Sequence, residues 1–305
     1  MMIELEKLST EENNLNSKDI ELQDSLEIVR RINEEDKKVA FCVEKELGSI
    51  SRLIDAILSK YKKETRIIYI GAGTSGRLGI LDASECPPTY GVSFEKVQGI
   101  IAGGNEAIFK AKENAEDNPE LGKQDLLNIN LTENDAVIGL AASGRTPYVL
   151  GAIEYANSIG AVTGSITCSK NSDLSKVSQY PIEVPVGAEI VTGSTRMKAG
   201  TAQKMILNMI STTLMIKLGK VFSGYMVDVK TSNQKLIERA KRIIMKTANC
   251  DYEKASDTLK KSGNDVKTAI VMILLDIDRD MATEKLKQYD NNVAKLIHEY
   301  SEKNI

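Results

Sequence analysis

One pattern recurs five times in this chain: a short apolar run that leads into a loop of small or polar residues, in most cases with a helical stretch beyond it. The runs show no polar alternation, which is typical of strands buried on both faces of a parallel sheet. Strands that alternate with helices favour right-handed crossovers and helices on both sides of the sheet. We therefore predict an α/β fold with a five-stranded doubly wound parallel sheet. Its predicted strands are residues 66–70, 96–101, 136–140, 161–166 and 181–186.

Helical periodicity lies on both sides of the predicted sheet. The first twenty residues are polar and predict a loosely ordered arm, and apolar residues then recur at helical spacing up to residue 63. Beyond residue 225, polar turns separate short helical stretches, and residues 262–265 (Ser-Gly-Asn-Asp) look like a helix stop followed by a new cap. These later helices are predicted at 236–247, 252–261, 265–274 and 283–289. The predicted parts are an N-terminal arm with helices (1–45), a sheet domain (46–228) and a small all-α domain (229–305).

Charge and hydropathy exclude several classes of function. The 305 residues carry a formal net charge of −3, so the surface as a whole does not favour nucleic acid or anionic membranes. No apolar run approaches the roughly 20 residues that span a bilayer, and the N-terminus does not resemble a signal peptide. We expect a cytoplasmic protein without nucleic-acid or membrane partners, in which any phosphate binding is local to a site.

Cysteine and histidine usage limits the chemistry further. The four cysteines are widely spaced and form no CxxC pair, which argues against a zinc site or a disulfide framework. The single histidine, His298, lies in a polar segment near the end of the chain, so a histidine-dependent triad is not expected. The chemistry is left to carboxylates, hydroxyls, Lys, Arg and backbone groups, and we predict no metal and no cofactor.

The first predicted strand ends in a glycine-rich loop, residues 71–77 (Gly-Ala-Gly-Thr-Ser-Gly-Arg). Glycines allow close approach to the backbone, and exposed N–H groups at a helix start favour an anion. The spacing is not G-x-G-x-x-G, and the next strand ends in Gly103-Gly104 in place of an acidic residue, which argues against a dinucleotide site. The loop therefore favours a phosphate, although a tight turn between strand and helix would also use glycines.

Two further loops strengthen the case for an anion. In residues 142–147, Ser143 can donate to a phosphate, and Thr146 followed by Pro147 is a typical helix start. Residues 192–201 open a long helix with Arg196, Lys198 and several hydroxyls, where acidic residues would suit the helix dipole better. An anionic ligand would supply the missing negative charge. In a doubly wound sheet, ligands bind beyond the carboxyl ends of the strands, where these loops fall.

These motifs resemble those of known proteins. The Ser143-Gly144-x-Thr146 loop, paired with the glycine-rich loop, resembles the sugar isomerase (SIS) domain. Longer blocks over most of the chain resemble the N-acetylmuramic acid 6-phosphate etherase family. The blocks are residues 71–79, 82–89 (Asp-Ala-Ser-Glu-Cys-Pro-Pro-Thr), 101–104, 115–117 (Ala-Glu-Asp) and 192–201. The C-terminal part resembles the three-helix ubiquitin-associated fold, for which we expect a packing or dimer role.

The resemblance implies a reaction and two glutamates. That family cleaves the lactyl ether of N-acetylmuramic acid 6-phosphate with water, giving N-acetylglucosamine 6-phosphate and D-lactate in cell-wall sugar recycling. By motif the glutamates are Glu85 and Glu116, although neighbouring carboxylates such as Glu113 compete for the second role. We assign Glu85 as acid and Glu116 as base, and the reverse stays open. The acid should be partly desolvated, here by residues 86–90.

The resemblance also implies a homodimer whose active site is completed by the neighbouring subunit, with a phosphorylated amino sugar as substrate. A sugar-phosphate isomerase and a non-catalytic sugar-phosphate sensor are the alternatives on the same fold, and the two glutamates argue against a pure sensor. The expected substrate-binding residues are Gly73, Thr74, Ser75, Ser84, Ser143, Gly144, Arg145, Thr146, Glu189, Ser194, Thr195 and Lys198.

Overall fold

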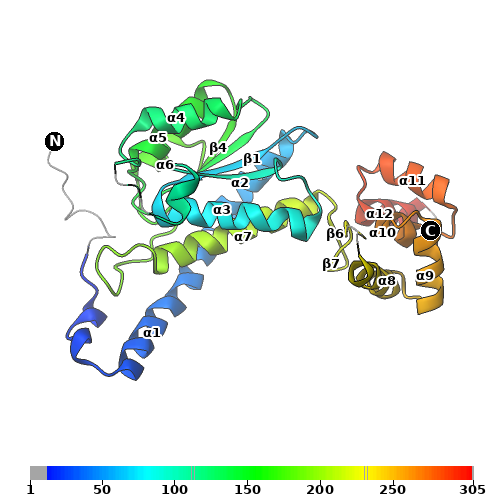
Figure 1. The fold of residues 1–305 in the computed structure, drawn as a ribbon, viewed down its shortest axis with the longest axis horizontal. Coiled ribbons are helices and arrows are strands. Elements are labelled where there is room, and N and C mark those ends of the chain that lie inside the picture. The colour runs from blue at the N-terminus through cyan, green and yellow to red at the C-terminus, as the bar shows by residue number, and fades with distance from the viewer. Residues whose placement is uncertain (1–11, 111, 113, 230, 232, 304–305) are drawn as a thin grey trace. The chain divides into compact units, whose positions relative to one another are not determined.

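The computed structural model describes residues 12–303 except 111, 113, 230 and 232 (Figure 1). The described chain forms two compact units. The first runs up to Glu85 and includes Ser93–Ser211, and the second combines Cys86–Val92 with the chain from Thr212 onward. No helix in the described part of the chain has both the length and the hydrophobicity of a bilayer span.

The first unit is built on a five-stranded sheet, in which all neighbouring strands are parallel and the order is β2-β1-β3-β4-β5. Nearly every residue of the central strands is buried, as their unbroken apolar runs predict. The predicted α/β class and all five predicted strands are confirmed. The strands are β1 (Ile67–Gly71), β2 (Val97–Ile101), β3 (Ala136–Leu140), β4 (Val162–Thr167) and β5 (Tyr180–Glu183).

Helices cover both faces of this sheet (Figure 1). On one face, α4 and α5 pack against Ile68, Ile70 and Val137. On the other, α3 lies so close to the sheet that a Cβ at Gly79 would be 2.9 Å from the Cβ of Tyr69. The helices are α1 (Ser25–Glu44), α2 (Leu47–Ser59), α3 (Gly73–Tyr90), α4 (Pro119–Asn128), α5 (Pro147–Ser158), α6 (Asp173–Val177) and α7 (Lys198–Lys217).

The described part of the N-terminal segment is fixed by hydrogen bonds. Short 3₁₀ turns at Leu15–Ser17 and Ile20–Leu22 precede α1. Asn14 Nδ2 donates to the carbonyl of Ala188 at 2.8 Å, and Ser17 Oγ donates to that of Ile190 at 2.6 Å. The expected loosely ordered arm is thus bound to the chain near residue 190, and residues 1–11 of it lie outside the described residues.

The second unit is mainly helical. Its helices are capped by Asn or Asp side chains, as at Asp265, whose carboxylate accepts the backbone N–H of Thr268 at 2.7 Å. The four predicted helices are present, and α12 was not predicted. The elements are a hairpin of β6 (Val221–Phe222) and β7 (Tyr225–Met226), followed by α8 (Gln234–Ala248), α9 (Tyr252–Lys261), α10 (Val266–Leu275), α11 (Arg279–Gln288) and α12 (Val293–Lys303).

Candidate active site

The carboxyl ends of the central strands bring the predicted loops together. Gly71, the last residue of β1, is in register with Ile101 of β2 and Leu140 of β3, so the loops that follow begin at one edge of the sheet. A Cβ at Gly76 would lie 2.8 Å from the carbonyl oxygen of Gly71, so that glycine serves close packing of α3. Gly73 differs, because it has a φ of +53° and nothing near its Cβ position. Close packing therefore explains why residue 76 is a glycine, whereas the Cα of Gly73 faces open space.

A cavity of about 140 Å³ lies at this edge. Glu116 lines it, is exposed, and makes no side-chain hydrogen bond or ion pair with the described residues. The cations in the lining are engaged: Arg77 donates to two backbone carbonyls at 2.7 Å, and Lys112 pairs with Glu106 at 2.9 Å. Glu116 therefore presents to this cavity a carboxylate that has no partner among the described residues. The lining residues are Ala72, Gly73, Arg77, Ala102, Ala107, Lys112 and Glu116.

The second loop lies beside Glu116. The backbone N–H of Tyr148, in the first turn of α5, donates to the carbonyl of Glu116 at 3.0 Å. Thr146 stands at the N-cap of α5, but its side chain makes no capping hydrogen bond. Gly144 has a φ of +67° and packs against Ser172. Glu116, Gly73 and the start of α5 are thus brought together. The strand-end pattern predicts this for the loops of Gly73 and Thr146, and the motif resemblance alone selects Glu116.

Most hydroxyls around this edge are not used by the chain itself. Within the described residues, the side chains of Thr74, Thr146, Ser194 and Thr195 form no hydrogen bond, and Ser143 Oγ accepts only the N–H of Arg145, at 3.3 Å. The Arg145 side chain is exposed. Hydroxyl donors without internal partners can bind phosphate oxygens.

Two other predicted hydroxyls are engaged inside the chain. Ser75 is buried, and its Oγ donates to Gln203 Oε1 of α7 at 2.9 Å. Ser84 Oγ donates back to the carbonyl of Leu81 at 2.8 Å within α3. These two side chains therefore serve the packing and geometry of α3 in the described structure.

The loop before α7 is held by charged groups of the chain itself. Glu189 is buried and its carboxylate accepts the backbone N–H groups of Lys198 and Ala199, at 3.0 and 2.9 Å. It therefore supplies the negative charge that seemed to be missing at this helix start, and our inference that a ligand must supply it is wrong. Thr195 lies beside the first loop, because a Cβ at Gly200 would be 3.6 Å from both the Thr195 carbonyl oxygen and Thr74 Cγ2.

Lys198 is engaged in a buried ion pair. Its Nζ lies 2.6 Å from Glu35 Oε2 of α1, and both side chains are almost fully buried. Burial alone would raise the pKa of Glu35, but hydrogen bonds from Lys198, Lys38 and Asn16 outweigh it and lower the pKa from its ordinary 4.5 to about 2. The carboxylate is thus charged at neutral pH and neutralises Lys198.

Glu85 is not brought to Glu116 within one chain. It lies on α3, twelve residues after Gly73, and a helical rise of 1.5 Å per residue places its Cα about 18 Å from the start of the helix. Its side chain is exposed, so its own chain does not provide the desolvation that we expect of an acid. Glu113, the competing carboxylate, lies outside the described residues.

Sequence reasoning missed three residues of this region. Lys112 lines the cavity, Glu35 neutralises Lys198, and Gln203 accepts the hydroxyl of Ser75. Gln203 could have been found from the sequence, because it is a polar residue on an apolar face of α7. The partners of Lys112 and Glu35 depend on tertiary packing.

Two family models match the chain. The glucokinase regulatory protein N-terminal SIS domain matches residues 49–157, and the SIS domain matches residues 114–213. They agree with the SIS fold expected from the loops after β1 and β3.

Curated relatives match nearly the whole chain. N-acetylmuramic acid 6-phosphate etherase of Clostridium botulinum (strain Eklund 17B / Type B) is 56% identical over 96% of this chain and 97% of its own length. The protein of the same name from Clostridium beijerinckii is 55% identical over 99% of both chains. A third, from Bacillus cereus (strain AH820), is 53% identical over 96% of this chain and 100% of its own length. The chain belongs to the N-acetylmuramic acid 6-phosphate etherase family.

Proposed function

We propose that this chain cleaves the lactyl ether of N-acetylmuramic acid 6-phosphate with water, giving N-acetylglucosamine 6-phosphate and D-lactate, in the cytoplasm. The observation that carries the proposal is the Glu116 carboxylate, which has no partner among the described residues and lies in a cavity beside unused hydroxyls. The names of the relatives at 53–56% identity support it.

The phosphate is bound by the loops after β1 and β3. Thr146 and Ser143 donate hydroxyls at the N-terminus of α5, where the helix dipole also favours an anion. Thr74, Ser194 and Thr195 add donors from the neighbouring loops. Glu189 and Lys198 act as positioning residues, since their buried contacts fix the loop that carries Ser194 and Thr195.

The reaction proceeds by elimination and hydration. Opening of the sugar ring gives an aldehyde, which makes the proton on C2 acidic, and Glu116 as general base removes it. The C3–O bond to lactate breaks as Glu85, the general acid, protonates the departing oxygen. A C2=C3 double bond conjugated with the aldehyde results. Water then adds its hydroxyl to C3 and a proton returns to C2, which gives N-acetylglucosamine 6-phosphate.

The two glutamates come from different subunits in this proposal. Along α3, Glu85 is about 18 Å from the cavity edge at Gly73, too far to act on a carbon adjacent to the one that Glu116 deprotonates. The cavity of about 140 Å³ is also smaller than the roughly 300–1,000 Å³ of small-molecule sites. A homodimer in which the partner adds its Glu85 would complete the site and remove that carboxylate from solvent.

Release of D-lactate tests the reaction. Folded protein incubated with N-acetylmuramic acid 6-phosphate should release D-lactate and N-acetylglucosamine 6-phosphate in equal amounts. An isomerase would interconvert an aldose and a ketose phosphate without lactate, and a sensor would bind the sugar without turnover. Absence of lactate from a folded preparation refutes the etherase proposal.

Mixed dimers test the shared site. Glu85→Gln and Glu116→Gln homodimers should both be inactive, but a heterodimer of the two has one intact site. Random subunit exchange between equal amounts should therefore restore roughly a quarter of the wild-type activity. If both glutamates acted within one chain, mixing would restore nothing, and the dimer proposal would fail while the lactate assay still held.

A further inference from the structure

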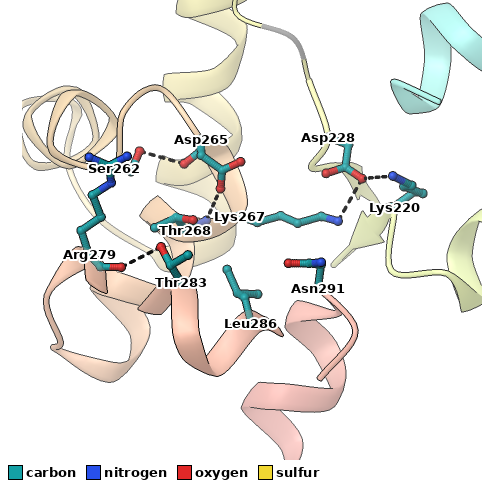
Figure 2. A pocket seen from close by; sticks show the side chains of 10 residues that line it. All are labelled: Lys220, Asp228, Ser262, Asp265, Lys267, Thr268, Arg279, Thr283, Leu286 and Asn291. Carbon is teal, nitrogen blue, oxygen red and sulfur yellow. Dashed lines mark hydrogen bonds and ion pairs between the residues drawn. The ribbon is translucent and has the colours of Figure 1, made fainter. Parts of the chain in front are cut away.

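The second unit contains a larger cavity that the proposed reaction does not use. Its volume of about 390 Å³ is in the range of small-molecule sites, and its walls are mostly polar (Figure 2). The side chains come from the hairpin region and from the ends of α9, α10 and α11. The lining residues are Lys220, Asp228, Ser262, Asp265, Lys267, Thr268, Arg279, Thr283, Leu286 and Asn291.

The cations of the cavity are not balanced by its carboxylates. Asp228 Oδ2 is shared by two ammonium groups, Lys220 Nζ at 2.7 Å and Lys267 Nζ at 2.9 Å, which leaves one positive charge in excess. The Lys267 side chain is only 6% exposed. Burial, with a smaller effect of the Lys220 charge, lowers the pKa of Lys267, and the carboxylates of Asp228 and Asp265 oppose that shift. Because two ammonium groups share one carboxylate oxygen, an anion entering the cavity would offset the repulsion between them.

The second carboxylate, Asp265, and the third cation, Arg279, offset each other in the charge sum, so the lining keeps a net charge of +1. Asp265 accepts the backbone N–H of Thr268 as the N-cap of α10 and forms no ion pair within the described residues. Arg279 also forms no ion pair within the described residues. It lines the side of the cavity opposite Asp228, toward which Lys267 extends (Figure 2). The side chains of Thr268 and Asn291 form no hydrogen bond with the described residues and are available as donors.

We propose that this cavity binds the phosphate group of a small phosphorylated molecule, held by Lys220, Lys267 and Arg279. A phosphate monoester carries between one and two negative charges near neutral pH, so it would offset the net charge of +1 that Lys220, Lys267, Arg279, Asp228 and Asp265 give the cavity lining. Lys and Arg are its usual partners in proteins. The volume leaves room for a sugar-sized group beyond the phosphate. The inference does not depend on the etherase reaction.

Amide chemical shifts of the full-length, isotopically labelled protein test this binding, because they separate the cavity from the loops near Glu116. The probes are inorganic phosphate, N-acetylglucosamine 6-phosphate and, as a control, unphosphorylated N-acetylglucosamine. We expect the amides of Lys267, Thr268 and Asn291 to shift in a saturable way with a phosphate probe and not with the control sugar. A response to inorganic phosphate alone identifies free phosphate as the ligand, and a response to both identifies a phosphate monoester.

Charge variants give opposite predicted effects. Lys220→Gln removes the excess charge and should weaken phosphate binding by about tenfold or more, whereas Asp228→Asn increases the excess and should tighten it. Lys254→Gln, an exposed change on α9 away from the cavity, should leave binding unchanged. Two results would overturn the proposal, even if Asp228→Asn fails to fold. One is that the cavity amides do not shift at about 10 mM phosphate, which is well above a dissociation constant of about 1 mM. The other is equal phosphate binding by Lys220→Gln and the wild type.

Discussion

The loop after β3 and the loop before α7 look alike in sequence, since each places Ser, Gly, Thr and a cation at a helix start. The structure uses them differently. At Thr146 the hydroxyl has no internal partner, and α5 begins without a side-chain cap. At α7 the buried Glu189 caps the helix, and Lys198 is neutralised by Glu35. The two helix starts therefore differ in their side-chain caps and cations: Glu189 caps α7 and Glu35 neutralises Lys198, whereas the side chains of Thr146 and Arg145 have no partner within the described residues.

The largest effect that this comparison predicts is on catalysis at the cavity beside the start of α5. Glu116→Gln should lower kcat by about 10²–10⁴-fold, because a general base contributes that much. The free energy of unfolding should change little, since the carboxylate has no partner among the described residues. Lactate release and urea denaturation measure the two quantities. Asp117→Asn, an exposed neighbour, is the control, and equal losses in both variants would contradict the assignment of Glu116.

At the start of α7, a change should affect stability more than catalysis. Glu35→Gln leaves the Lys198 ammonium buried without a counter-charge, and we expect it to destabilise the fold by about 3–5 kcal/mol. Urea denaturation measures this loss. Lys38→Gln removes the second, largely exposed cation that pairs with Glu35 and should cost at most about 1 kcal/mol. If the two variants were equally stable, the buried pair would not be what holds the loop before α7.

The same pair predicts a pH dependence. Since the pKa of Glu35 is about 2 in the folded protein and about 4.5 when unfolded, its contribution is complete above pH 4.5 and is lost as the pH falls toward 2. The wild type should therefore lose more stability between pH 4.5 and 2 than Glu35→Gln does. Urea denaturation at a series of pH values checks this. Parallel curves for the two proteins would show that Glu35 has an ordinary pKa.

The sequence allowed the sheet to be predicted because strands buried on both faces are recognisable from local apolar runs, as at Ile67–Gly71 and Ala136–Leu140. It also predicted that the loops with Gly73 and Thr146 lie together, because parallel strands end at one edge, whereas Glu116 is selected only by the motif resemblance. It could not reveal that Glu189 caps a helix nine residues away or that Glu35 reaches Lys198 across 163 positions. Those partners are chosen by tertiary packing, which composition and periodicity do not encode.

The smallest predicted effect separates two hydroxyls of the site region. Thr146→Ala should raise KM by about tenfold through one lost hydrogen bond to a charged phosphate, with little change in stability, because the hydroxyl makes no internal bond. Ser75→Ala should instead cost about 1 kcal/mol of stability and leave KM nearly unchanged, since Ser75 Oγ donates to the buried Gln203. Initial rates and urea denaturation of both variants decide the matter. If Ser75→Ala changed KM more than Thr146→Ala, the substrate would depend on a hydroxyl that is already bonded within the chain. Internal hydrogen bonding would then not distinguish structural from ligand-binding hydroxyls in this region.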